Sequence, residues 1–449
     1  MLAIFTLGFA WIALSVFFLP FYPWTEGLFR PWLIINGLAP YRDALWNRGA
    51  VDIYLLAAVY KFFGVSPLVY QSVMFVLYAG TAGLLLWGLR RHQKLAIVSF
   101  VVYVLFLPIF FSNAEIEEVL VGFFALGSFF SLWHFQEKKR VGYLVIAGAL
   151  AGLAAMTKQT AGIISAVTVL SMLFTRTLAW YLGGVALAVG SVFLFLASQG
   201  ILDDFWVSML FVAGVYKGWA KPWGIAEGTA LALGLLSLVV PFIFLSRKQT
   251  LMPKEISRLL SALVIALFAL LLPSYWSYRL VATFPLWCII AAVVVLESYR
   301  LRSVLDGVGI ALFLVFTFPF ARDYVQFIRD NGISFGQYIR DYGEEELTAA
   351  AWLRDHTAGE TRVFNLANNI ILVESERLPH NRYVGGMPID FLPFDKTAAE
   401  MSQNPPSVAI VDRRVLADWP ELKTWKFIDF LQKRYTLQQE FGSIAIYFL

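Results

Sequence analysis

The chain has 449 residues, of which 59% are apolar and only 15% are charged, and its mean hydropathy is +0.68. A typical soluble domain carries about 25% charged residues, so these values exclude a soluble globular enzyme, a disordered chain and a disulfide scaffold. The formal net charge of +4 is small, and the single cysteine, Cys288, can form neither an internal disulfide nor a zinc cluster. The composition predicts a polytopic α-helical membrane protein.

Apolar runs recur along most of the chain. A helix needs about 20 apolar residues to cross the hydrocarbon core, and fewer inside a bundle. The first run has no basic segment before it and no small-residue cleavage site before Pro23, so we interpret it as an anchor rather than a signal peptide. We predict about 11 transmembrane helices, at 2–22, 67–89, 95–112, 117–136, 141–156, 160–175, 178–198, 225–245, 257–273, 278–296 and 303–321.

The connections between these runs alternate in charge. By the positive-inside rule the basic turns are cytoplasmic, which places the N-terminus inside and, after an odd number of crossings, the C-terminus outside. The long segments 23–66, 199–224 and 322–449 then share the outer face, which indicates chemistry at the outer membrane surface. The basic residues gather at every second connection, at 90–94, 138–140, 176, 247–258 and 300–302.

The C-terminal segment 322–449 has the charge density of a soluble domain. Its helices and strands alternate, which predicts a small α/β domain beside a transmembrane domain at 1–321. No G-x-G-x-x-G or Walker A pattern follows its strands, so we expect no nucleotide cofactor. The predicted elements are helices at 344–356 and 422–434, strands at 362–366 and 407–411, and two closing strands that flank Gly442.

The first outer loop holds several residues that could carry chemistry. Glu26 directly follows the first apolar run, where partial desolvation would make a carboxylate a better general base than in water. Alternatively, Thr25 and Glu26 simply begin a surface helix. Asp43 is the rival candidate for the base, and it could also form an interfacial ion-pair cluster with Arg42 and Arg48.

A second acidic group opens the fourth apolar run. Glu115 and Glu118 lie three residues apart and share a face of the expected helix. Carboxylates at the edge of a bilayer are costly unless they are paired, hydrated or bound to a cation. They form either a hydrated helix start or part of a polar cavity, where Glu115 would hold an acceptor or a divalent ion.

Lys158 interrupts the otherwise uncharged segment 141–175. We predict that it lies at an outer turn between two short helices, or in a cavity. An isolated lysine there requires an anion, and a lipid-linked phosphate is the natural one. Gly148 and Gly152, four residues apart, instead predict close helix packing.

A short aromatic turn at 273–279 is the last candidate. Arg279 could bind a phosphate as a planar fork, and Tyr275 is a further cavity residue. The alternative is an interfacial aromatic belt with a snorkelling arginine. The four histidines are scattered, and none has the spacing of a metal motif.

Taken in order along the chain, these motifs resemble the GT-C superfamily of integral-membrane glycosyltransferases. The more similar members are bacterial proteins allied to protein O-mannosyltransferases and to the aminoarabinose transferase of lipid A. Many relatives have two adjacent acids in the first loop, whereas this chain has Thr25 before Glu26. The resemblance is carried by that acid, by GLAPYRD at 37–43, by IYLLAAVYKFFG at 53–64 and by KQTAG at 158–162.

The resemblance implies a hexosyl- or pentosyltransferase that moves a sugar from a polyprenyl-phosphate donor to a hydroxyl acceptor. Transfer would be inverting, on the extracytoplasmic face of a bacterial or archaeal cytoplasmic membrane. Glu26 would be the general base, and Lys158, with Arg279 or Arg48, would hold the leaving phosphate.

The expected partners follow from this function. They are the lipid-linked donor, membrane lipids and a glycan, lipid or protein acceptor, and no nucleic acid is expected. A divalent metal ion stays open as a cofactor. The alternative function is a transporter of lipid-linked sugars that performs no covalent chemistry, which would require charged residues along a path through mid-membrane.

Overall fold

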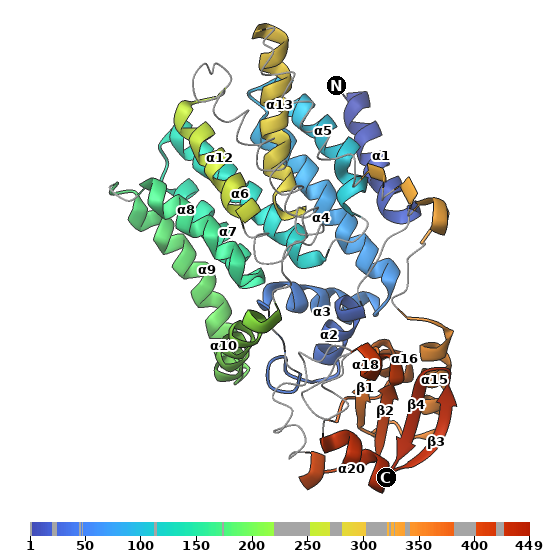
Figure 1. Ribbon diagram of the computed structural model, residues 1–449. Coiled ribbons are helices and arrows are strands. Elements are labelled where there is room, and N and C mark those ends of the chain that lie inside the picture. Colours follow the sequence, from blue (N-terminus) through green and yellow to red (C-terminus); the bar gives the residue numbers. More distant parts are fainter. Residues whose placement is uncertain are drawn as a thin grey trace.

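The structure is a computed structural model, and most of its described residues are helical (Figure 1). It describes residues 2–19, 25–44, 46, 48–111, 115–172, 175–219, 252–269, 281–301, 321–322, 325–326, 328–336, 342–380, 401–418 and 426–449.

The apolar runs form a bundle of helices (Figure 1). At its centre lies α6, in which 89% of the residues in the most apolar 18-residue stretch are buried. Among the described residues, the helices of this bundle are α1 (Leu2–Phe18), α4 (Pro67–Gly88), α5 (Gln93–Phe111), α6 (Ile116–Lys138), α7 (Gly142–Thr157), α8 (Gly162–Met172), α9 (Leu178–Ser198), α12 (Lys254–Ala269) and α13 (Phe284–Leu301).

The polytopic helical class predicted from composition is confirmed, because each predicted run inside the described residues coincides with a helix. Within those residues α4, α6 and α9 are long and apolar enough to cross a membrane, and shorter apolar helices accompany them. The predicted runs at 225–245 and 303–321 lie outside the described residues. The count of about 11 crossings stays a prediction.

Close packing of α7 against α9 confirms the prediction made from the glycines. A side chain added at Gly148 would collide with the backbone carbonyl of Tyr181, and one added at Gly184 would collide with that of Val145. Small residues on both helices therefore let the two backbones approach each other.

Two further helices lie at one end of the bundle. They are α2 (Thr25–Ile35) and α3 (Val51–Phe63), and both belong to the first long loop. Figure 1 shows them between the bundle and the C-terminal segment, with α10 (Leu202–Trp219) at the same end. The long connections and the C-terminal segment thus gather at one end of the molecule.

The C-terminal segment forms a small α/β unit around a four-stranded sheet of order β1-β2-β4-β3. β1 pairs in parallel with β2, with Val363 opposite Val408, and the other pairs are antiparallel. The α/β character predicted from the sequence is therefore observed. The elements are α15 (Glu344–His356), β1 (Val363–Leu366), α16 (Ile370–Ser375), β2 (Val408–Asp412), α18 (Arg413–Asp418), α20 (Lys426–Arg434), β3 (Thr436–Phe441) and β4 (Ile444–Phe448).

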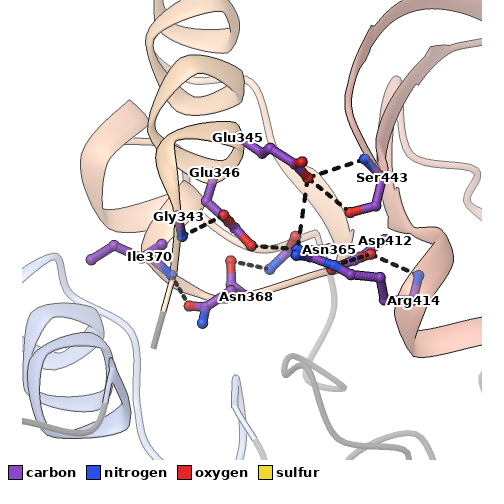
Figure 2. Close-up of polar contacts among 9 residues, drawn as sticks. All are labelled: Gly343, Glu345, Glu346, Asn365, Asn368, Ile370, Asp412, Arg414 and Ser443. Atoms are coloured by element: carbon purple, nitrogen blue, oxygen red, sulfur yellow. Dashed lines mark hydrogen bonds and ion pairs between the residues drawn. The ribbon is translucent and has the colours of Figure 1, made fainter. Parts of the chain in front are cut away.

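Polar contacts tie α15 to the sheet (Figure 2). Arg414 donates to Glu346 at 2.7 Å and to Asp412 at 2.9 Å. Glu345 accepts from the backbone N–H of Ser443 at 3.1 Å and from its hydroxyl at 3.0 Å. These bonds join the first turn of α15 to the end of β2 and to the β3–β4 turn, so the helix is fixed against the sheet.

Candidate functional site

Glu26 lies in the first turn of α2, so one of the two interpretations made from the sequence, a helix start, describes its backbone. Its side chain is nevertheless held at both oxygens. Arg30 Nε donates to Oε2 at 2.6 Å, and Asn369 Nδ2, from the C-terminal unit, donates to Oε1 at 2.9 Å. The Glu26 side chain remains 37% exposed, so it is accessible from solvent.

Trp46 joins this carboxylate region to a second arginine. The Arg30 guanidinium lies 5.2 Å from the centre of the Trp46 ring, and that of Arg48 lies 5.5 Å from it. The indole N–H of Trp46 donates to the carbonyl of Gly49 at 3.0 Å, which fixes the ring. Both guanidinium groups are thus held on one aromatic side chain.

Arg48 forms ion pairs with Glu115 and with Glu117. Glu115 caps α6 in an extended conformation, and Glu117 lies within its first turn, where carboxylates are favoured. The side chains of Glu115 and Glu117 are 11% and 4% exposed. Glu117 was not among the predicted site residues, although it lies between two that were.

Lys158 lies at the break between α7 and the short 3₁₀ helix at Gln159–Ala161, as predicted. Its ammonium group pairs with Glu118, and the two side chains are 14% and 4% exposed. The expectation that Lys158 is isolated and therefore requires an external anion is wrong. Its partner comes from a segment 40 residues away and could not be identified from local sequence.

A backbone contact brings these two ion pairs to the same place. The N–H of Gly49 donates to the carbonyl of Thr157 at 3.2 Å. A side chain at Gly49 would collide with the carbonyl of Met156, so this approach requires glycine. Since Arg48 precedes Gly49 and Lys158 follows Thr157, the two cations flank one contact.

Asp52, in the first turn of α3, is a buried acid that was not among the predicted site residues. Its side chain is 2% exposed, and its Oδ1 atom has no hydrogen-bond partner. Burial raises the pKa of Asp52 to about 7, while the nearby charge of Arg48 acts in the opposite direction. The signal available in the sequence was a single carboxylate in a helix whose only other charged residue is Lys61.

Asp43 and Arg42 bond within their own loop. Asp43 Oδ2 accepts from the N–H of Ala39 at 2.8 Å, and its Oδ1 accepts from Arg42 Nε at 3.3 Å. Arg48 is instead placed against the acids of α6, so the structure separates it from the pair with which it was grouped. Arg279 and Tyr275 lie outside the described residues.

The described acids do not form a donor set for a metal ion. Glu115 and Glu118 each pair with a different cation. Within the described ranges no group of three or more histidine, cysteine, aspartate or glutamate side chains could hold a metal. What the arrangement offers is a partly exposed carboxylate, connected through Arg30 and Trp46 to a half-buried pair of cations, Arg48 and Lys158.

The sequence matches no protein-family model and no curated protein. The fold, however, is similar to that of solved structures. The apo oligosaccharyltransferase from Archaeoglobus fulgidus matches with a TM-score of 0.57 at 12% identity, over 92% of this chain and 69% of that one. Structures of that enzyme also exist with zinc and sulfate, and with an inhibitory peptide and a dolichol-phosphate.

Two further structures share the fold. ArnT from Cupriavidus metallidurans, bound to undecaprenyl phosphate, has a TM-score of 0.56 at 12% identity, over 99% of this chain and 96% of that one. The arabinofuranosyltransferase AftD from Mycobacteria has a TM-score of 0.50 at 14% identity, over 91% of this chain and 36% of that one. The chain therefore has the GT-C fold that the sequence resemblance predicted.

Proposed function

We propose that this protein is an integral-membrane glycosyltransferase that moves a sugar from a polyprenyl-phosphate donor to a hydroxyl acceptor. The observation that carries the proposal is the partly exposed carboxylate of Glu26, which Arg30 and the Trp46 ring connect to the half-buried Arg48. Lys158, also half-buried, flanks the same backbone contact as Arg48. The fold supports it, because the ArnT structure, matched over 99% of this chain, binds undecaprenyl phosphate. A transporter is not favoured, because these fold relatives are glycosyltransferases.

In the proposed reaction, Glu26 takes the proton of the acceptor hydroxyl. The acceptor oxygen then attacks the anomeric carbon from the face opposite the phosphate, which inverts its configuration. The bond from that carbon to the phosphate oxygen breaks, and the electron pair leaves with the lipid phosphate. General-base assistance of this kind contributes about 10²–10⁴-fold to the rate.

The leaving phosphate gains negative charge as that bond breaks, and cations in a site of low dielectric stabilise such charge. An arginine has five N–H donors and a lysine has three, so each can bind a phosphate oxygen in addition to a carboxylate. We assign this role to Lys158 and Arg48, with Arg279 as a further candidate. A phosphate would therefore enter an ion-pair network that already exists.

Because Glu26 contacts the C-terminal unit, the proposal places segment 322–449 and the site on the same side of the membrane. The basic turns make that side extracytoplasmic and the N-terminus cytoplasmic. An alkaline phosphatase reporter fused after Gly359 should therefore be active. If that fusion is inactive, and a reporter that works only in the cytoplasm is active when fused at the same position, this orientation is wrong.

The function is tested with purified protein and a panel of radiolabelled polyprenyl-phosphate sugars, scored for release of polyprenyl phosphate. Glu26→Gln keeps the size of the side chain but cannot take a proton at neutral pH. We expect turnover to fall by about 10²-fold or more while donor binding persists.

Asp43→Asn is the matched control, since it makes the same change in the rival first-loop acid. We expect its turnover to stay within about threefold of wild type, because the Asp43 carboxylate bonds within its own loop. An active Glu26 variant with an inactive Asp43 variant would reverse the assignment. Two fully active variants with an authenticated substrate would refute the mechanism.

A further inference from the structure

The carboxylate of Glu26 receives one of its two hydrogen bonds from a residue 343 positions away. That residue, Asn369, precedes α16, which packs against α2. The other donor, Arg30, is 6% exposed and belongs to the same helix as Glu26. One oxygen of Glu26 is therefore hydrogen-bonded by its own helix, α2, and the other by the C-terminal unit.

From the local sequence, the side chain of Asn369 would be expected to cap α16, but it does not. An asparagine before a helix normally accepts a bond from that helix's own backbone. Asn369 occupies the N-cap of α16 but makes no such bond. Its neighbour Asn368 does so instead, because its Oδ1 accepts from the N–H of Ile370 at 3.0 Å (Figure 2). The side chain of Asn369 is thus available for Glu26.

A second buried asparagine sets the orientation of the Asn369 amide. Asn365, on β1, donates from Nδ2 to the Oδ1 of Asn369 at 3.1 Å and to the carbonyl of Ala367 at 3.1 Å. Asn365 and Asn369 are 1% and 2% exposed. Because the oxygen of Asn369 faces Asn365, its N–H₂ group is directed at Glu26.

We propose that Asn369 is a positioning residue for Glu26 and that the C-terminal unit thereby completes the site. An amide donor orients the carboxylate without adding charge. With one oxygen on Arg30 and the other on Asn369, the exposed lone pairs of Glu26 point in a fixed direction. The role in turnover rests on the proposed function, whereas the contact itself does not.

The test compares two isosteric substitutions in adjacent residues, Asn369→Asp and Asn368→Asp. Both add one negative charge, but only the first replaces a donor to Glu26 by an acceptor. Two carboxylates at hydrogen-bond distance share a proton, so proton uptake by Glu26 is impaired. For Asn369→Asp we expect kcat to fall by about tenfold or more at pH 7, with the donor KM changed by less than about threefold.

The pH profile separates positioning from a loss of folding. In Asn369→Asp the pH of half-maximal turnover should rise by about one unit or more, because the proton shared between the two carboxyl groups is harder to remove. Asn368→Asp should keep the wild-type profile and a turnover within about twofold of wild type, since an aspartate still caps α16. Equal loss in both variants, or none in Asn369→Asp, would overturn the proposal.

Carbodiimide labelling of Glu26, read by mass spectrometry, tests the contact without any substrate. The reagent activates protonated carboxyl groups, so Asn369→Asp should label Glu26 at least about threefold faster at neutral pH than wild type or Asn368→Asp. Failure of every sugar donor would remove the proposed function but leave this readout intact. An unchanged labelling rate in Asn369→Asp would refute the contact, whatever the reaction. If that variant is not recovered folded, Asn369→Ala, which removes the donor without adding a charge, should still lower kcat while the donor KM changes by less than about threefold.

Discussion

The two ends of α6 carry charged side chains in opposite environments. At the start of the helix Glu117 and Glu118 are each 4% exposed and pair with Arg48 and Lys158. At its end, Glu137 is 20% exposed and pairs with Arg91, which is 56% exposed. The acids of these pairs are buried at the end of α6 that contacts α3, whereas the pair at the other end is more exposed, chiefly at Arg91.

Local sequence does not distinguish these two ends. At both ends the charges are those that the helix dipole favours, with acids in the first turn of α6 and Lys138 in the last. Burial makes the difference, because a buried charge that loses its partner is strongly destabilising whereas an exposed one is solvated by water. The contrast therefore predicts large effects at one end and small effects at the other.

The largest effect is expected from Lys158→Met, which leaves Glu118 buried without its partner. The cost should be about 3–5 kcal/mol of stability, visible as a lower midpoint of thermal unfolding in detergent. The double variant Lys158→Met/Glu118→Gln removes both charges and should recover most of that loss. If it does not, the ion pair is not what stabilises this end.

The same pair of variants separates stability from donor binding. Under the proposed function, binding of polyprenyl phosphate should be weakened about tenfold or more in both, because neither retains the lysine. Wild-type affinity in the stable double variant would make Lys158 a structural residue.

An effect on the order of 3 kcal/mol is expected from the pH dependence of Asp52. The pKa of Asp52 is raised by burial from its ordinary value of 3.8 to about 7, so between these values the folded state binds more protons than the unfolded state. Stability should therefore fall as the pH rises from about 4 to 7 and level off above. Arg48 and Glu115 are the charges that face this group and act on it in opposite directions.

Asp52→Asn keeps the shape of the side chain and removes its titration. The difference in midpoint temperature between variant and wild type should grow from pH 5 to pH 7.5, in favour of the variant. Parallel curves would show that Asp52 does not titrate in this range.

The smallest effect is expected at the opposite end of α6. Arg91→Gln breaks the exposed pair with Glu137, whose Oε2 atom lies 2.9 Å from Arg91 Nη1. We expect a change below about 1 kcal/mol that shrinks further in high salt. A loss as large as that for Lys158→Met would remove the contrast between the two ends.

The sequence by itself determined the elements of the fold. Apolar runs and their breaks predicted the helices, and the alternation of helices and strands after residue 322 predicted the α/β unit, because both signals are local. It also identified Glu26, Lys158, Glu115 and Glu118, since charges are rare in such a chain. The resemblance of its motifs to those of GT-C enzymes predicted the fold.

Only the tertiary structure decided which of these charges meet. It paired Lys158 with Glu118 and Arg48 with Glu115, and it joined Asn369 to Glu26 across 343 residues. It also showed that Asp52 is buried, whereas the sequence pattern indicates only that this residue lies near the start of a helix. The physical reason is that the partner of each charged side chain depends on how the helices and the C-terminal unit pack. Packing brings together residues that are far apart in the sequence, and no local pattern identifies such pairs.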